Sequence, residues 1–269
     1  MCVSMFPADF SGTTISIYAT IHPVHGLIHV LGYSNTSVNY NVGPNAMILH
    51  FPSAEAMTQA NFIKHNAPNI HTDMWNAAEP KRLTREINSF GVGKSLVFNH
   101  DIYTVVLAAN AREIPKVLSL VPEDRRPNMN SQLFDYYDQN FSNWSIALCC
   151  FNTQQAQEAL PMLVWYKPRW PHLMILPGVD CHTGGIPNHN DMVDVDHKII
   201  LGDHMMTASE GSQVDYTDPG SDAIRDFLPR RVIGHYLNGK MRNGDFVYKR
   251  DDVLNGDLTG MVRKRSEEH

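Results

Sequence analysis

The chain has 269 residues, of which 43% are hydrophobic and 19% charged, and its formal net charge is −6. This balance supports a sizeable buried core and excludes extensive disorder. Its apolar runs are far shorter than the roughly 20 residues that cross a bilayer, and its first residues lack the basic opening of a secretion signal. We therefore expect a single globular domain over residues 1–269 that makes no membrane contact.

Short segments rich in β-branched and aromatic residues, bounded by Gly, Pro or Asn, predict strands along the whole chain. They are 15–20, 27–33, 46–51, 95–99, 103–108, 145–151, 162–166, 172–176, 197–201, 232–236 and 246–249. Fewer segments carry helix signals, and these are 54–65, 155–160, 110–121 and 221–228. Clustered strands with occasional helices favour an α+β fold, with mixed or largely antiparallel sheets and a few packed helices.

The four cysteines indicate a reducing compartment. Cys149 and Cys150 are adjacent inside an apolar run, which is typical of reduced core thiols and not of a disulfide framework. We therefore predict a cytoplasmic protein.

Cys2 is the first candidate for chemistry. Removal of Met1 would place a thiol and a free α-amine on one residue, and such an amine can act as the base for its own side chain. The turn that ends the second predicted strand, with Gly32 and Asn35, follows within the same N-terminal region. The alternative is that Cys2 is simply the second residue of a frayed or packed terminus.

These features resemble, over about the first 35 residues, the N-terminal-cysteine amidohydrolases of the choloylglycine type. That family opens with Met-Cys and has a Gly-x-Asn-like turn at the end of an early strand. The resemblance implies that Cys2 is the nucleophile, that Asn35 or Asn45 donates to the oxyanion, and that Tyr33 lies near the substrate. The family's arginine in this turn is absent here, where Tyr33 and Ser34 stand instead.

A second candidate lies in the glycine-bounded turn 177–185. In an extended stretch Asp180 and His182 point to the same side, so the carboxylate could orient the imidazole, or both could bind one metal ion. Cys181 faces the other way and is a candidate substrate contact. The same turn could equally serve only to close a hairpin.

Asp196 and His197 form the third candidate, a metal site. Carboxylates are suitable hard ligands for a divalent cation, and further histidines lie nearby in the sequence. Strand alternation places Asp196 and His197 on opposite faces, which weakens a shared site. A solvated strand face with a core histidine is the simpler interpretation.

Aromatic and basic segments leave partners open. Trp165 belongs to an aromatic cluster that could contact a substrate, line the core or join two copies of the chain in a homo-oligomer. Residues 225–265 contain ten Lys or Arg against five acids, which is typical of an anion-binding or solvated face. Nucleic acid is not the partner that we expect.

The leading hypothesis is a hydrolase or acyl-transfer enzyme that acts on a C–N amide bond of a small molecule or peptide through Cys2, with no cofactor. Asp180 and His182 would shape its proton-transfer environment. One alternative is a metal-dependent enzyme with an Asp/His site at 180–204. Another is a non-enzymatic binding or assembly protein.

Overall fold

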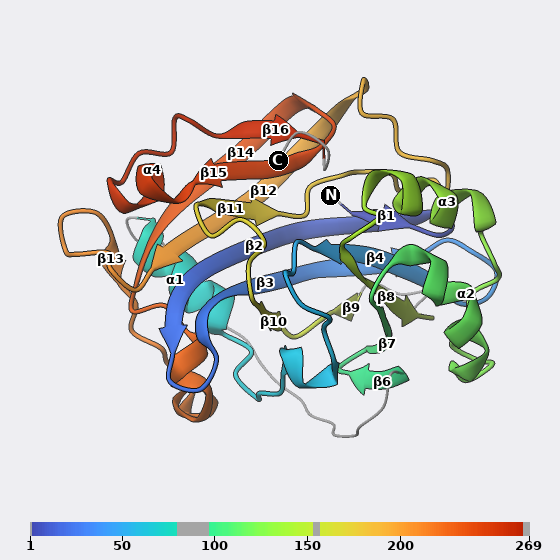
Figure 1. Ribbon diagram of the computed structural model, residues 1–269, viewed down its shortest axis with the longest axis horizontal. Helices are drawn as coiled ribbons and strands as arrows, with labels where there is room; N and C mark the ends of the chain where they lie inside the picture. The colour runs from blue at the N-terminus through green and yellow to red at the C-terminus, as the bar shows by residue number, and fades with distance from the viewer. Residues whose placement is uncertain (1, 80–96, 153–156, 266–269) are drawn as a thin grey trace.

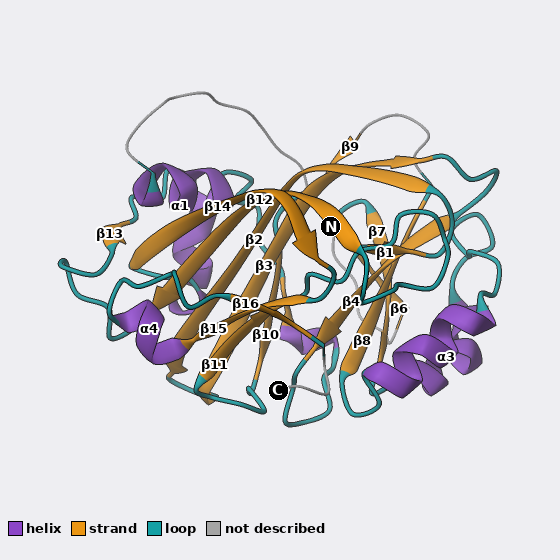
Figure 2. Ribbon diagram, turned by 90° about the horizontal axis from the view of Figure 1, so that it is seen from above, coloured by secondary structure: helices purple, strands orange, loops and turns teal. Residues whose placement is uncertain are grey.

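The computed structural model describes residues 2–79, 97–152 and 157–265. It is rich in sheet, with 44% strand and 19% helix, and its sheets are antiparallel or mixed (Figures 1 and 2). This confirms the predicted α+β class. No helix in the described ranges has the length and apolar character of a membrane span; the longest α-helix, α3, has 10 residues.

The largest sheet is built on a long hairpin. Strands β2 and β3 pair antiparallel over most of their length, and β12 joins β2 in parallel, while the other pairings in this sheet are antiparallel. The strands are β13 (Ser212–Gln213), β14 (Arg231–Arg242), β12 (Met192–Asp203), β2 (Ala8–His22), β3 (Gly26–Asn39), β10 (Met162–Tyr166) and β5 (Phe62–Ile63), with β9 (Gln157–Glu158) paired to β3.

Two smaller antiparallel sheets complete the structure. One has the order β1 (Val3–Ser4), β4 (Asn45–Phe51), β8 (Ser145–Phe151), β7 (Tyr103–Ala108) and β6 (Val97–His100). The other has the order β11 (Leu173–Leu176), β15 (Asp245–Lys249) and β16 (Val262–Lys264). A buried pair joins them, because His50 Nε2 on β4 lies 2.8 Å from Asp245 Oδ1 on β15.

The helices cover the ends of this sheet assembly. Figure 2 shows α1 beside β14 at one end and α3 near β8 and β4 at the other. The α-helices are α1 (Ile70–Ala78), α2 (Ile114–Val117), α3 (Ser131–Asn140) and α4 (Arg250–Leu254). The 3-10 helices are η1 (Gln59–Asn61), η2 (Ala111–Glu113), η3 (Leu118–Leu120) and η4 (Pro219–Phe227).

Two helix predictions are wrong. The only helical part of residues 54–65 is the short η1. Asn61 Nδ2 at its end donates to the Trp165 carbonyl at 2.8 Å, and the next two residues form β5, which pairs with β10. Of the predicted helix 155–160, residues 155–156 lie outside the described ranges and 157–158 form β9, an addition to the edge of β3. In both places sheet pairing overrides local helix propensity. The prediction for 110–121 is confirmed as the series η2, α2 and η3, and that for 221–228 as η4.

Candidate functional site

The start of the chain pairs with the segment that contains Asp180 and His182. The carbonyl of Cys2 accepts from the Cys181 amide at 3.1 Å, and the Ser4 amide donates to the Cys181 carbonyl at 3.0 Å. The Ala8 amide donates to the His182 carbonyl at 3.0 Å. This pairing, which joins residues about 180 positions apart, places the first and second candidate sites side by side.

Hydrogen bonds to Asn243 and Asp245 anchor the segment that pairs with the start of the chain. Asn243 accepts from the Asp180 amide at 2.8 Å and donates to the Asp180 carbonyl at 2.9 Å. The Gly178 amide donates to the buried Asp245 carboxylate at 2.9 Å. An ideal Cβ on Gly178 would lie 2.7 Å from the Gly244 carbonyl oxygen, so only glycine fits there. The segment is therefore anchored before it meets the N-terminal strand.

The Cys2 thiol is enclosed. Cys2 is 4% exposed and belongs to the largest core cluster, and its Sγ lies 3.9 Å from His182 Nε2. Burial raises the pKa of the Cys2 thiol far above its ordinary value. Because the thiolate is the reactive form, the enclosed thiol is protonated and a poor nucleophile at neutral pH.

Asp180 and His182 lie together but do not form a relay. His182 Nε2 is 2.8 Å from Asp180 Oδ1, and the same ring nitrogen faces the Cys2 sulfur. In a nucleophile–His–Asp relay the imidazole uses its two different nitrogens for the two partners. Burial by itself would raise the pKa of Asp180, but the adjacent His182 and the Cys2 amide outweigh burial and lower it. Asp180 is therefore an anionic anchor for the N-terminal strand.

The two candidate oxyanion donors are occupied by other partners. Asn45 accepts from the Phe6 amide and donates to the Phe6 carbonyl, both at 3.0 Å. Asn35 donates to the Tyr33 hydroxyl at 3.3 Å and accepts from Tyr103 at 3.2 Å. Both asparagines are buried, so in this arrangement they stabilise the fold around Cys2 and point no free donor at a substrate.

The other predicted substrate contacts lie in different surroundings. Trp165 stacks on His25, with ring centroids 4.0 Å apart, and donates from Nε1 to the Ala60 carbonyl at 2.9 Å. Cys181 is partly exposed, with its Sγ 3.4 Å from Thr183 Oγ1. The structure therefore places Cys181 next to Cys2 along the paired backbones and gives Trp165 a packing role on β10.

No metal centre forms around Asp196 and His197. Asp196 accepts from the Tyr236 hydroxyl at 2.6 Å on the exposed side of β12, whereas His197 is buried on the opposite side. Burial lowers the pKa of His197 to about 3. Within the described ranges no three His, Cys, Asp or Glu side chains group closely enough to hold a metal ion.

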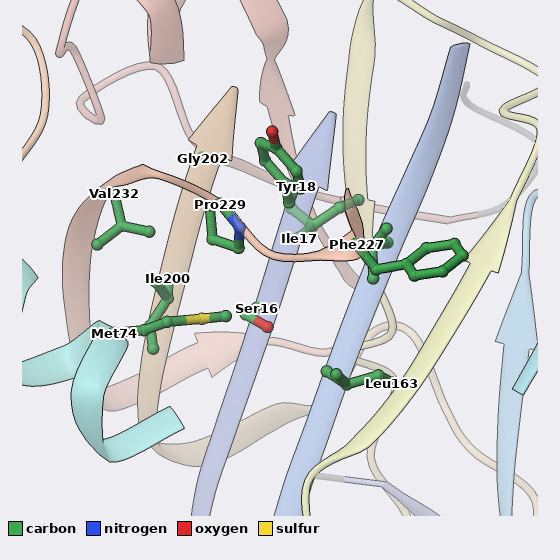
Figure 3. Close-up of a pocket in the computed structure, with 11 residues that line it drawn as sticks. Ser16, Ile17, Tyr18, Met74, Leu163, Ile200, Gly202, Phe227, Pro229 and Val232 are labelled. Carbon is green, nitrogen blue, oxygen red and sulfur yellow. The ribbon is translucent and has the colours of Figure 1, made fainter. Parts of the chain in front are cut away.

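A buried serine–histidine–serine group was not found from the sequence. His71 on α1 lies 3.0 Å from Ser16 Oγ and 2.7 Å from Ser34 Oγ, and burial lowers its pKa to about 3. Figure 3 shows Ser16 at a cavity of about 10 Å³ between α1 and the large sheet. Such a volume holds about one water molecule, so this group has no room for a substrate. No sequence motif links the three residues.

Four segments without charged residues lie together around the start of the chain. We call this surface the N-terminal face; it comprises residues 6–7, 40–44, 128–130 and 183–188. None of these segments contains Lys, Arg, Asp or Glu. The most exposed apolar side chains on it are Tyr40 (64%), Val42 (96%), Met129 (51%) and Ile186 (52%).

Hydrogen bonds hold the segments of the N-terminal face together. The Tyr40 amide donates to the Pro7 carbonyl at 3.1 Å. Asn130 Nδ2 donates to the carbonyls of Met5 and Gly184 at 3.2 and 3.0 Å. Pro7 and Thr183 form an isolated antiparallel bridge. The four segments therefore form one surface.

No family model matches the sequence, and no curated protein matches it. The chain has a distant similarity to solved structures of baculovirus P35. A P35 crystal structure has a TM-score of 0.45 and 13% identity, covering 93% of this chain and 92% of that one. Two structures of mutated P35 after caspase cleavage have TM-scores of 0.38 with 13% and 10% identity. They cover 72% and 90% of this chain, and 67% and 91% of the P35 chains.

Proposed function

We propose that the chain is a non-enzymatic binding protein that docks a protein partner on the N-terminal face. The observation that carries the proposal is four strongly exposed apolar side chains on adjoining segments that contain no Lys, Arg, Asp or Glu, in a chain of which 19% is charged. Contact surfaces between proteins are depleted of charge at their centre and enriched in aromatic residues and Met. Tyr40 and Met129 fit that composition, and exposed apolar patches commonly mark interaction sites.

The state of Cys2 supports binding over catalysis. Its sulfur is enclosed, its thiol pKa is raised by burial, and its backbone is tied to Cys181. In this arrangement Cys2 is part of the framework that presents the N-terminal face.

All four cysteines are free, which suits the reducing cytoplasm that we propose as the location.

As partners to test we take proteases first, and the panel includes a caspase, the class of enzyme that cut P35 in two of the similar structures. A second copy of the chain is tested in parallel by analytical ultracentrifugation.

Two substitutions on the N-terminal face test the proposal. Val42→Asp and Ile186→Asp each place a charge on the surface that the partner would cover, so we expect the affinity for the partner to fall at least tenfold. Affinity is measured by surface plasmon resonance with the full chain immobilised. The matched control is Val24→Asp, since Val24 is 80% exposed in the β2–β3 turn. Unchanged affinity in both variants would overturn the proposal.

Acyl transfer by Cys2 is the second candidate function. It is favoured by the 3.9 Å separation of Cys2 Sγ and His182 Nε2, which places a base beside the thiol. Its substrate would be an amide of a small molecule or peptide. Intact-mass measurement tests it first, because a retained Met1 leaves Cys2 without a free α-amine. Modification of Cys2 by iodoacetamide, in competition with a substrate amide, tests whether the thiol becomes accessible.

A further inference from the structure

An arginine-lined hollow lies at the end of the pair β2–β12, away from the residues considered above. Its volume is about 690 Å³, within the range of small-molecule sites. Residues from β2, from the end of β12, from β13 and from the stretch that runs from η4 to the start of β14 line it. We call it the arginine hollow, and its lining includes Tyr18, Thr20, His204, Arg225, Arg230 and Arg231.

The charge of the arginine hollow is positive. Its lining contains three arginines and two carboxylates, but Asp203 is already neutralised, because Arg250 Nε donates to it at 2.6 Å. Asp226 is the other carboxylate. Two positive charges therefore remain in excess, which matches the charge of a phosphate monoester at neutral pH.

The three arginines keep guanidinium N–H groups that can donate to a ligand. Within the described ranges, no carboxylate lies within ion-pair distance of Arg225, Arg230 or Arg231. Arg231 uses one nitrogen to donate to the Gly211 carbonyl at 3.0 Å, and Arg225 stacks over Tyr216 at 5.2 Å. These contacts orient the two side chains and leave several N–H groups for a ligand. Guanidinium groups bind phosphate oxygens in pairs, so this arrangement suits a phosphate.

Hydroxyl and imidazole groups add to the site. Tyr18 and Thr20 are buried on β2 and also line the hollow. Figure 3 shows Tyr18 beside the small cavity, so this side chain separates the small cavity from the arginine hollow. The His204 amide is tied to the Ala19 carbonyl at 2.9 Å, which fixes His204 at the edge of the hollow.

We propose that the arginine hollow binds a small-molecule phosphate monoester. The arginines would hold the phosphate, and the remaining volume, bordered by the apolar side chains of Ile21 and Pro23, would take the organic part. This site and the N-terminal face share no residue, so each stands or falls without the other.

Isothermal titration calorimetry with the full chain tests this site, using ribose 5-phosphate, ribose and inorganic phosphate as probes. We expect saturable binding of ribose 5-phosphate, weaker binding of inorganic phosphate and none of ribose. Raising the salt concentration should weaken the binding. Failure of ribose 5-phosphate to bind, or equal affinities for it and for ribose or inorganic phosphate, would overturn the assignment.

Variants locate the binding. Arg230→Gln and Arg225→Gln should each lower the affinity for ribose 5-phosphate at least tenfold. Arg225 and Arg230 are both exposed, so both variants should fold. The matched control is Arg112→Gln, since the Arg112 side chain is 74% exposed and lies outside the hollow. Equal affinities in the two variants and the control would place the ligand elsewhere and refute the proposal.

Discussion

The N-terminal face and the arginine hollow are two surfaces formed in different ways by the same set of sheets. The first has no charged residue in its segments, and backbone and asparagine hydrogen bonds hold it together. The second is defined by charge, and Asp203 in its lining forms a buried ion pair with Arg250. At the first surface, substitutions are limited by close backbone packing, as at Gly184 beside Phe6. At the second, they are limited by the need to keep the charge of Arg250 paired with Asp203.

Asp203→Ala, at the arginine hollow, should cause the largest loss of stability. Asp203 is fully buried and holds Arg250 at 2.6 Å, so its removal leaves Arg250 as a largely buried charge without its partner. We expect the free energy of unfolding to fall by about 3–5 kcal/mol. Urea denaturation followed by circular dichroism measures it. Asp194→Ala is the control, because its exposed pair with Lys240 at 3.5 Å should contribute less than about 1 kcal/mol.

Gly184→Ala should have the next largest effect and act on the N-terminal face. Gly184 has φ +77°, and an ideal Cβ there would lie 2.7 Å from the Phe6 Cα. Strain and clash together should cost about 3 kcal/mol, measured by the same denaturation. Gly256→Ala separates the two causes, because Gly256 has a similar φ of +71° but its nearest atom is 3.5 Å away. A cost of about 1 kcal/mol is expected there, and equal costs would contradict the role of the clash.

Low pH should lower the free energy of unfolding of the sheets that carry both surfaces. Burial lowers the pKa of His29, His71 and His197 to about 3 in the folded chain, whereas the unfolded value is near 6.5. Protonation therefore favours unfolding. Stability is full above pH 6.5 and is lost as the pH falls from 6.5 towards 3. At pH 5 each histidine should cost about 2 kcal/mol.

Denaturation at a series of pH values checks this effect. His71→Gln should flatten the dependence between pH 6.5 and 5, because one titrating group is removed. A free energy of unfolding that stays constant over this interval would show that these histidines are not buried as described.

Val42→Asp should have the smallest effect on stability. Val42 is 96% exposed, so the charge stays in water and the free energy of unfolding should change by less than about 0.5 kcal/mol. Thermal denaturation measures this change. A larger loss would mean that Val42 supports the fold, and weaker partner binding by this variant could then not be assigned to the surface.

Most strands could be predicted from the sequence because their apolar residues are dense and their ends are marked by turns. Residues 103–108, 145–151 and 162–166 form β7, β8 and β10 with the predicted bounds. The helix at 54–65 could not be excluded, since its outcome depends on the distant β10, to which Phe62 and Ile63 pair. Local composition contains no information about that pairing.

Two helices were missed although the sequence contains their signals. In α1, Ile70 and Met74 are four residues apart, as are His71 and Trp75, and all four are buried. In α3, Asn130 caps the helix by accepting from the Leu133 amide at 3.3 Å. Short length and interspersed polar residues concealed both patterns.

The leading hypothesis assigned Cys2, Asp180 and His182 to one catalytic scheme. Cys2 was chosen for its position, and Asp180 and His182 for their spacing, and the structure places all three together. Their enclosure and the shared His182 nitrogen could not be predicted, because both depend on pairing across about 180 residues. The N-terminal face was missed because its four segments are short and look like ordinary loops in the sequence.

The backbone hydrogen bond between Cys181 and Cys2 also determines when folding can be completed during synthesis. The first strand has no partner for residues 2–4 on that side until residue 181 has left the ribosome, and β2 waits for β12 in the same way. At ~5–20 residues per second this delay lasts roughly 10–40 s. The nascent chain therefore carries its long first hairpin with one edge open, and the N-terminal face forms only after two thirds of the polypeptide have been made.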